Sequence, residues 1–390
     1  MLSWLSFAPA AAPDVAYHGR WDVSGASAVC GWPMSGFSVT TNGTTVSAKM
    51  AAGSTGASLV VLVDGKVHAN VTVAAGASTQ AYTLASTQAY TLASQLSPGT
   101  HRVAAFKVTE DLELSSVSLA AGGGSELHLH EVTSDGTLQR PAAQGGRKLE
   151  FIGDSDTAGW CSLGKPLGGD GALKHEDAYV TWAQQLARGV NASETSTVAV
   201  SGWGVTTDSA PIQKVYRNTY GQGSSVPRWD FSTWVPDAVV MLIGPNDESL
   251  LRRIGERDGA AVVEAAEEGA AAGAVAGDGS GSFVKAYLAL MTEVASAYAD
   301  APTPPKLVHV CGGSINGLDP CDDIQTANQR FNDDPPKGFK GYYTTISKKS
   351  WQMINKAGSK YKGCDAHYSP LGHKVLADAI RPQLEAIMGW

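Results

Sequence analysis

The sequence predicts an antiparallel β-sandwich over residues 15–140, followed by an α/β/α three-layer domain with a mostly parallel sheet over residues 146–390. Three observations support this division. Apolar and polar residues alternate in the first part, as in half-buried strands, whereas fully apolar runs alternate with helical patterns in the second. A polar segment with several glycines, TSDGTLQRPAAQGGRK, separates the two parts. A chain of 390 residues with 43% hydrophobic content is long enough for two cores.

In the first part, runs such as FSVTTNGTTVSAKM and GTHRVAAFKVT predict short strands. Asn42-Gly43 and Asp64-Gly65 each lie between two such runs, which is the strongest local signal for a hairpin. The octapeptide STQAYTLA occurs twice in succession over residues 78–93. Because this unit is too short for a repeat protein, we interpret the duplication as a lengthened loop or strand edge.

In the second part, the runs KLEFIG, STVAVSG, DAVVMLIG and KLVHVCGG predict buried parallel strands. Segments between them, such as DAYVTWAQQLARGV and FVKAYLALMTEVASAYA, have helical periodicity. Functional sites in such domains lie at the carboxyl ends of the strands. Residues 257–282 interrupt this order with an Ala/Gly-rich stretch that is poor in large apolar residues, and we interpret them as a surface insertion.

Composition narrows the class of partner. The net charge of −8 gives no electrostatic attraction to nucleic acid or to an anionic membrane, and no apolar run is long enough to span a bilayer. A neutral or polar small substrate fits this chain better. Residues 1–14 combine an apolar patch with an Ala-rich stretch, which predicts a tail or an atypical secretion signal. Glycosylation tripeptides at Asn42, Asn70 and Asn191 also favour secretion.

Four motifs supply the groups that a serine hydrolase needs. Ser155 follows a strand-like run and would start a helix, where backbone N–H groups face a reacting carbonyl. The SGWG motif offers the backbone N–H of Gly202 to an oxyanion, with Gly204 as the competing choice. The GPND motif adds the side-chain amide of Asn246. Near the C-terminus, DAHYSPLGH offers His367 as the general base.

Several of these residue types also have structural interpretations. Serine is a common helix cap and asparagine a common turn residue. His373 is an alternative base, but it falls within the final helical pattern, where a structural histidine is more common. His128 and His130 share one face of a strand and resemble a metal pair. No third ligand is apparent beside them, so we predict neither a metal nor another cofactor.

Together, GDSDTAG, SGWG, GPND and DAHYSPLGH resemble the four blocks of the SGNH, or GDSL, hydrolases. The segments YHGRWD, LVVLVDG, LSPGTHRVAAFKVTE and HEDAYVTWAQQLAR are similar to carbohydrate esterase family two. Members of that family join a jelly-roll domain to an SGNH domain and remove acetyl groups from plant polysaccharides and sugars. The resemblance covers nearly the whole chain apart from the duplication, the insertion and the tail.

The resemblance implies a secreted acetylesterase that acts on acetylated carbohydrate by an acyl-enzyme mechanism, and we expect it to be a monomer. It implies that Ser155 is the nucleophile and His367 the base, with Gly202, Asn246 and the backbone N–H of Ser155 as the oxyanion hole. Asp365 departs from the common pattern, because it lies two residues before the histidine instead of three. Either its carboxylate or a backbone carbonyl orients the imidazole.

Trp160 and Trp203 closely follow catalytic turns, and each is a candidate for a sugar platform or for core packing. Two other functions remain open. A lipase or thioesterase of the same superfamily would need an apolar channel, which the sequence does not indicate. A carbohydrate-binding protein with a decayed catalytic half would have lost its catalytic residues, whereas Ser155, Asn246 and His367 are all present.

The five cysteines are too few for a disulfide scaffold and too scattered for a zinc site. If the nucleophile and the base meet, Cys161 and Cys364 come into one neighbourhood and are candidates for a disulfide. Cys311 and Cys321 are candidates to close a short loop, which leaves Cys30 over.

Overall fold

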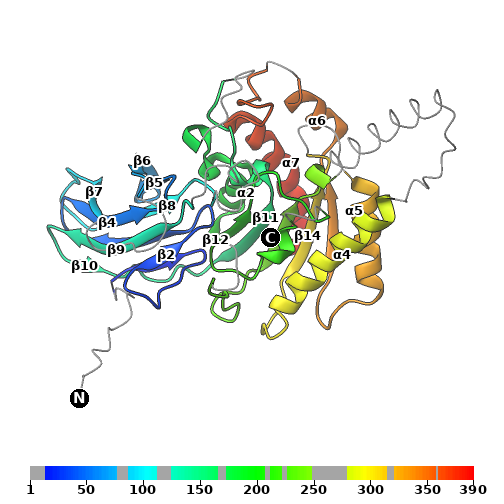
Figure 1. The fold of residues 1–390 in the computed structure, drawn as a ribbon, viewed down its shortest axis with the longest axis horizontal. Helices are drawn as coiled ribbons and strands as arrows, with labels where there is room; N and C mark the ends of the chain where they lie inside the picture. The colour runs from blue at the N-terminus through cyan, green and yellow to red at the C-terminus, as the bar shows by residue number, and fades with distance from the viewer. Residues whose placement is uncertain are drawn as a thin grey trace, which may run out of the picture.

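The computed structural model describes residues 14–76, 87–111, 124–165, 173–206, 211–221, 226–247, 279–313, 320–356 and 359–390. Strands β1 to β10 form one part of the molecule, here called the β-region, and the elements from β11 to α7 form the α/β-region (Figure 1). The predicted tail over residues 1–14 lies outside the described residues apart from Asp14. The predicted insertion over residues 257–282 also lies outside them, except for its last four residues, which begin a helix.

The β-region consists of two antiparallel sheets that enclose one core, built from side chains such as Phe37, Met50 and Leu59. The first sheet has the order β1 (Ala16–His18), β3 (Gly36–Thr41), β8 (His101–Lys107), β5 (Ala57–Val63) and β6 (Lys66–Val73), with β10 (Leu138–Gln139) paired to β3. The second sheet has the order β2 (Ala28–Cys30), β9 (Leu127–Ser134), β4 (Val46–Ala52) and β7 (Gln88–Ala93).

The two predicted hairpins have different outcomes. Asp64 and Gly65 join the paired strands β5 and β6, and both have positive φ angles, 51° and 78°, as this turn requires. The hairpin at Asn42-Gly43 is a wrong prediction, because β3 and β4 belong to different sheets. Asn42 instead accepts hydrogen bonds from the backbone N–H and the hydroxyl of Thr137, both at 2.9 Å, which hold a connection between the sheets.

The end of the duplicated segment forms β7, which is the edge strand of the second sheet. Residues 78–86, which complete the duplication together with Thr87, lie outside the described residues. A strand edge was one of the two outcomes that the sequence predicted for this segment.

The α/β-region is built on a parallel sheet in which all neighbouring strands run in the same direction, as the sequence predicts. Its strand order is β12 (Ala192–Ala199), β11 (Arg147–Gly153), β13 (Ala238–Leu242), β14 (Lys306–Cys311) and β15 (Gly341–Thr345). The first four strands contain the four predicted apolar runs. The fifth strand, with the sequence GYYTT, escaped prediction because it lacks such a run.

Side chains of each parallel strand alternate between two cores, one on each face of the sheet. Phe151 packs on the face covered by α2 (Trp182–Gly189) and α7 (Pro370–Met388). Ile152 packs on the face covered by α4 (Gly279–Ala297) and α5 (Cys321–Asp333) (Figure 1). The predicted three-layer arrangement follows from this alternation. Among the described residues, the shorter elements of this region are α1 (Ser155–Ala158), η2 (Leu173–His175), η3 (Ala178–Val180), η4 (Ile212–Lys214) and α6 (Lys348–Ile354).

Buried polar contacts join the two regions. Arg20 of the β-region forms a salt bridge of 2.9 Å with Glu150 of β11, and neither side chain is exposed by more than 1%. The hydroxyls of Tyr216 and Tyr298 donate to the same carboxylate at 2.7 and 3.1 Å. A buried ion pair needs this kind of additional hydrogen bonding to offset its lost hydration. Among the described residues, no helix has both the length and the apolar character that crossing a bilayer requires.

Candidate active site

Ser155 lies at the turn between β11 and α1, and two glycines permit this turn. A Cβ atom on Gly153 would come within 2.1 Å of Thr157 Oγ1, so that only glycine lets the helix fold back so closely on the strand. Gly159 ends the helix with a φ of 95°, and a Cβ there would lie 2.5 Å from the carbonyl carbon of Asp177. The spacing of the two glycines therefore fixes the position of the serine.

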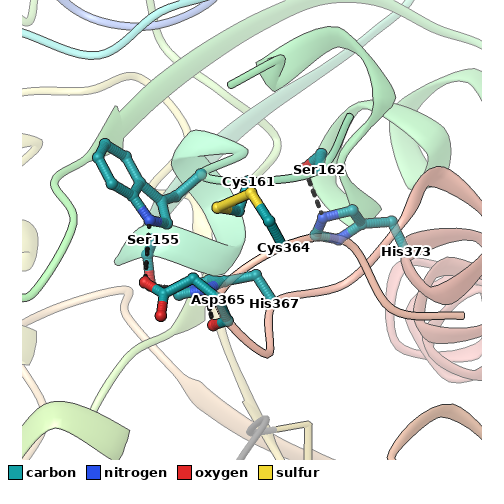
Figure 2. The surroundings of a disulfide bond; sticks show 8 residues. Ser155, Cys161, Ser162, Cys364, Asp365, His367 and His373 are labelled. Atoms are coloured by element: carbon teal, nitrogen blue, oxygen red, sulfur yellow. Dashed lines mark hydrogen bonds between the residues drawn. A yellow bond between two sulfur atoms is a disulfide. The ribbon is translucent and has the colours of Figure 1, made fainter. Parts of the chain in front are cut away.

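The structure brings the predicted nucleophile and base together. His367 Nε2 lies 2.9 Å from Ser155 Oγ, although the two residues are 212 positions apart (Figure 2). On the other side of the ring, Nδ1 lies 2.7 Å from the backbone carbonyl oxygen of Asp365. Because a carbonyl oxygen only accepts, Nδ1 carries the proton and donates it. Nε2 is then free to accept the hydroxyl proton of Ser155.

The carboxylate of Asp365 has a different partner, because its Oδ2 accepts a hydrogen bond from Trp160 Nε1 at 3.4 Å. Asp365 and Ala366 both have positive φ angles, 48° and 60°, and this local turn directs the carbonyl of Asp365 toward the ring of His367. Of the two alternatives from the sequence, the structure has the backbone carbonyl at the imidazole.

Replacement of Asp365 by asparagine is therefore expected to change kcat for p-nitrophenyl acetate by less than about threefold. Asparagine also tolerates a positive φ, so the carbonyl keeps its position. The substitution changes the contact with the Trp160 indole and removes a negative charge that raises the pKa of His367. Steady-state kinetics of the purified variant measures the effect. A loss of a hundredfold or more would show that the carboxylate acts on His367 during the reaction.

The imidazole of His367 is 8% exposed, and burial lowers its pKa below the ordinary value of 6.5, although the Asp365 carbonyl and carboxylate act in the opposite direction. Only the neutral ring can take the serine proton. Activity should therefore persist as the pH falls to 6.5 and disappear as the pH falls through the lowered pKa of His367.

The acid limb of kcat/KM for p-nitrophenyl acetate should accordingly have its midpoint below pH 6.5. Circular dichroism over the same pH range separates this titration from acid unfolding. A midpoint at or above 6.5 in a folded protein would contradict the effect of burial.

The predicted oxyanion groups follow β12 and β13, the two strands that pair with β11 on either side. Asn246 Nδ2 donates to the carbonyl oxygen of Trp203 at 2.7 Å and to Asp154 Oδ2 at 3.4 Å, which connects the three loops. Gly202 is exposed and has a φ of 79°. Gly204 is buried, and a Cβ there would lie 2.2 Å from Asp247 Oδ2. Close packing against Asp247 thus explains why residue 204 is a glycine. Gly202 is the glycine whose backbone is exposed, as an oxyanion donor needs.

Both candidate tryptophans are buried. Trp160 is 6% exposed and packs against the Cys161–Cys364 disulfide, and Trp203 is 3% exposed within the core of the α/β-region. A sugar platform needs an open ring face, which neither side chain has in this structure. Packing, the other interpretation from the sequence, accounts for both residues.

The disulfides match the predicted pairs. Cys161 and Cys364 form a bond that ties the loop after α1 to the loop that carries His367 (Figure 2). Cys311 and Cys321 close a loop between β14 and α5. Cys30 is a buried free thiol. The first bond holds together the two segments that carry the predicted nucleophile and base.

The other histidines have local roles. His373 is fully buried in α7, its Nε2 lies 3.1 Å from Ser162 Oγ, and burial lowers its pKa to about 3. His128 lies 3.3 Å from Ser27 Oγ and 3.8 Å from Glu126 Oε1. In the part of the chain that the structure describes, no three potential ligands come together as a metal site would require.

Lys362 stabilises the loop that carries His367, a role that the sequence did not indicate. Its Nζ donates to the carbonyl oxygen of Ala366 at 2.9 Å and to Asn355 Oδ1 at 2.6 Å, and it lies 4.4 Å from the ring centre of Tyr368. Burial lowers its pKa to about 8. These contacts brace the loop of His367 from within. A lysine in a polar loop gives no pattern from which this role could be predicted.

Comparisons with known proteins show which proteins this chain is similar to. Residues 17–123 match the family described as the carbohydrate esterase 2 N-terminal domain. The cellulase/esterase CelE of Acetivibrio thermocellus is 28% identical over an alignment of 388 residues, which covers 97% of this chain but 40% of that protein. The chain thus spans less than half the length of this curated relative.

Two solved structures extend the comparison. A family two carbohydrate esterase from Clostridium thermocellum, in complex with cellohexaose, is 26% identical with a TM-score of 0.72, and the match covers 96% of this chain and 99% of that one. The acetyl xylan esterase Est2A from the rumen bacterium Butyrivibrio proteoclasticus has a TM-score of 0.73 at 17% identity, over 97% and 96% of the two chains, which shows the common fold. These relatives confirm the predicted resemblance to carbohydrate esterase family two.

Proposed function

We propose that this chain, which resembles carbohydrate esterase family two along both of its regions, is a secreted enzyme that removes acetyl groups from carbohydrate. The observation that carries the proposal is the contact of 2.9 Å between Ser155 Oγ and His367 Nε2, with Nδ1 of the same ring held by a backbone carbonyl. This arrangement is that of a serine activated by a positioned base. The two disulfides support an oxidising location outside the cell.

In the first half of the reaction, His367 Nε2 takes the proton of Ser155 as Oγ attacks the carbonyl carbon of the acetyl group. The carbonyl oxygen becomes an oxyanion, which accepts hydrogen bonds from the backbone N–H groups of Gly202 and Ser155. Asn246 Nδ2 also donates to it, in place of its longer contact of 3.4 Å with Asp154 Oδ2. The carbonyl of Asp365 stabilises the imidazolium through Nδ1. Nε2 then gives the proton to the sugar oxygen, which leaves as an alcohol, and the acetyl group remains on Ser155.

In the second half, a water molecule gives a proton to His367 Nε2 and attacks the acetyl carbon. The same donors hold the second oxyanion. When it collapses, the proton returns to Ser155 Oγ and acetic acid is released, ionising in water. Every proton in this cycle passes through one ring nitrogen, which is the atom that the structure holds against the serine.

The finer features of the β-region belong to the same proposal. Its two packed antiparallel sheets support the jelly-roll topology of the family that the chain resembles. The Clostridium thermocellum esterase forms a complex with cellohexaose, which supports a carbohydrate as the substrate class here. We propose the acetyl group as the part removed, because nothing in the sequence indicates an apolar channel for a longer chain.

The test compares p-nitrophenyl acetate with p-nitrophenyl octanoate and measures acetate release from acetylated xylan, acetylated glucomannan and acetylated simple sugars. We expect kcat/KM for the acetate to exceed that for the octanoate, together with acetate release from at least one of the carbohydrates. A preference for the octanoate would indicate a lipase. Binding to a polysaccharide without turnover of any ester would indicate a carbohydrate-binding protein.

A further inference from the structure

We propose that Glu110 of the β-region is a positioning residue for the oxyanion hole. Its Oε2 accepts a hydrogen bond from the backbone N–H of Ser201 at 2.6 Å, and its side chain is fully buried. Ser201 immediately precedes Gly202, the glycine whose N–H is assigned to the oxyanion. The inference therefore rests on the proposed function, and it assigns to the β-region a part in catalysis besides packing.

The turn at Gly202 needs such an external contact. Gly202 is exposed and has a φ of 79°, and glycine has no side chain that would restrict it to one backbone conformation. An oxyanion donor must nevertheless be held in place before the charge develops. The contact with Glu110 fixes the N–H of the preceding residue and thereby limits the orientations open to Gly202.

Glu110 is itself held firmly, because a buried ammonium fixes its main chain. Lys107 Nζ donates to the carbonyl oxygens of Gly31, Thr109 and Glu110 at 3.0, 2.5 and 3.0 Å. Ser125 Oγ donates to the same carbonyl of Glu110. The loop that follows β8 therefore presents the carboxylate from a rigid base.

The same loop also reaches the segment of the nucleophile. Glu176 Oε1 accepts a hydrogen bond from the backbone N–H of Glu110 at 2.6 Å. The next residue, Asp177, donates its backbone N–H to the carbonyl oxygen of Gly159 at 3.1 Å, where α1 ends. Glu110 thus lies between the turn of Gly202 and the helix of Ser155, and it sets the two relative to each other.

The ionisation of this cluster suggests a matched substitution. Burial raises the pKa of Glu110 to about 7. Burial and the adjacent Glu110 raise the pKa of Glu176 well above its ordinary value. Lys107 and Asp111 are the other charged groups that face Glu110. Because a neutral carboxyl is thus accessible near neutral pH, glutamine has the size and the acceptor needed to replace it.

The kinetic test compares Glu110→Ala, Glu110→Gln and a control, Asp135→Asn. Asp135 is an exposed carboxylate of the β-region that accepts hydrogen bonds from Thr44 and Thr45. For Glu110→Ala, we expect kcat for p-nitrophenyl acetate to fall about 10- to 100-fold while KM changes less than about threefold. The affinity for a methylboronic acid inhibitor, which forms a tetrahedral anion on the serine, should fall by a similar factor.

Glu110→Gln should remain within about threefold of the parent kcat, because it keeps an acceptor for Ser201. Asp135→Asn should leave kcat unchanged. If the alanine variant does not fold, Glu110→Asp replaces it, since a carboxylate shortened by one carbon no longer reaches Ser201, and the same loss of kcat is expected. A folded alanine or aspartate variant with the parent kcat, or a glutamine variant as impaired as alanine, would overturn the inference.

Hydrogen exchange of the peptide spanning residues 198–206 tests the contact without any substrate. Loss of the acceptor should speed exchange at Ser201 about tenfold in Glu110→Ala, whereas Glu110→Gln should exchange like the parent. If the parent hydrolyses no ester but shows this exchange pattern, the proposed function fails and the contact stands. If the parent is an active esterase and neither kcat nor exchange responds, the inference about Glu110 fails alone.

Discussion

Ser155→Ala is expected to lower kcat for p-nitrophenyl acetate by at least about ten-thousand-fold. The substitution removes the oxygen that would carry the acetyl group, and His367 Nε2 then has no hydroxyl from which to take a proton. The oxyanion donors stay in place, so a small residual rate above that of the uncatalysed reaction should remain. Initial rates of the purified variant, measured at high enzyme concentration, give the effect.

His367→Ala should reduce kcat to a similar level, and the double variant should lose little more, because a nucleophile without its base is as ineffective as no nucleophile. Thermal unfolding of each variant is the control. Ser155→Ala loses one hydrogen bond and should unfold within a few degrees of the parent. Parent-like activity of Ser155→Ala would refute the assignment, and multiplying effects in the double variant would refute a shared step.

Removal of the Cys161–Cys364 bond by a double alanine substitution is expected to lower the free energy of unfolding by about 5 kcal/mol. The bond joins residues separated by 203 positions, and a cross-link that closes a longer loop restricts the unfolded chain more. Activity should fall as well, because the bond connects the loops that carry Ser155 and His367. Urea unfolding, followed by tryptophan fluorescence, measures the stability change.

The second disulfide provides a matched comparison, since Cys311 and Cys321 are only 10 positions apart. The loop-entropy relation predicts a smaller loss for its double alanine variant, about 3 kcal/mol. Equal losses from the two pairs would contradict the dependence on loop length. Equal losses would also show that the stabilisation by each disulfide depends on its local packing, such as the packing of Trp160 on Cys161–Cys364.

Much of the site could be predicted because parallel strands end at one edge of a sheet. The strands before Ser155, Gly202 and Asn246 are β11, β12 and β13, which are neighbours, so motifs at their ends meet by topology alone. The partner of His367 Nδ1 could not be predicted in this way. It depends on the left-handed conformation of Asp365 and Ala366, which no spacing rule describes.

Other errors and omissions have equally specific causes. An alternating pattern shows that a strand is half-buried but not which sheet it joins, so Asn42-Gly43 resembled a hairpin. The exposure of Trp160 and Trp203 depends on neighbours that are remote in the chain. Lys362 and Glu110 form hydrogen bonds with main-chain atoms. Because every residue has these atoms, the identity of the partner residue does not indicate the contact.

The salt bridge between Arg20 and Glu150 limits how this chain can be divided by an engineer. Residues 146–390 produced alone would keep the buried carboxylate of Glu150 in β11 and the two tyrosines that donate to it. They would lack the Arg20 guanidinium, which balances the charge of that carboxylate. Leaving one member of a buried pair without its counter-charge costs about 3–5 kcal/mol. The α/β-region is therefore not a portable module, and fusion proteins that use it should carry both regions.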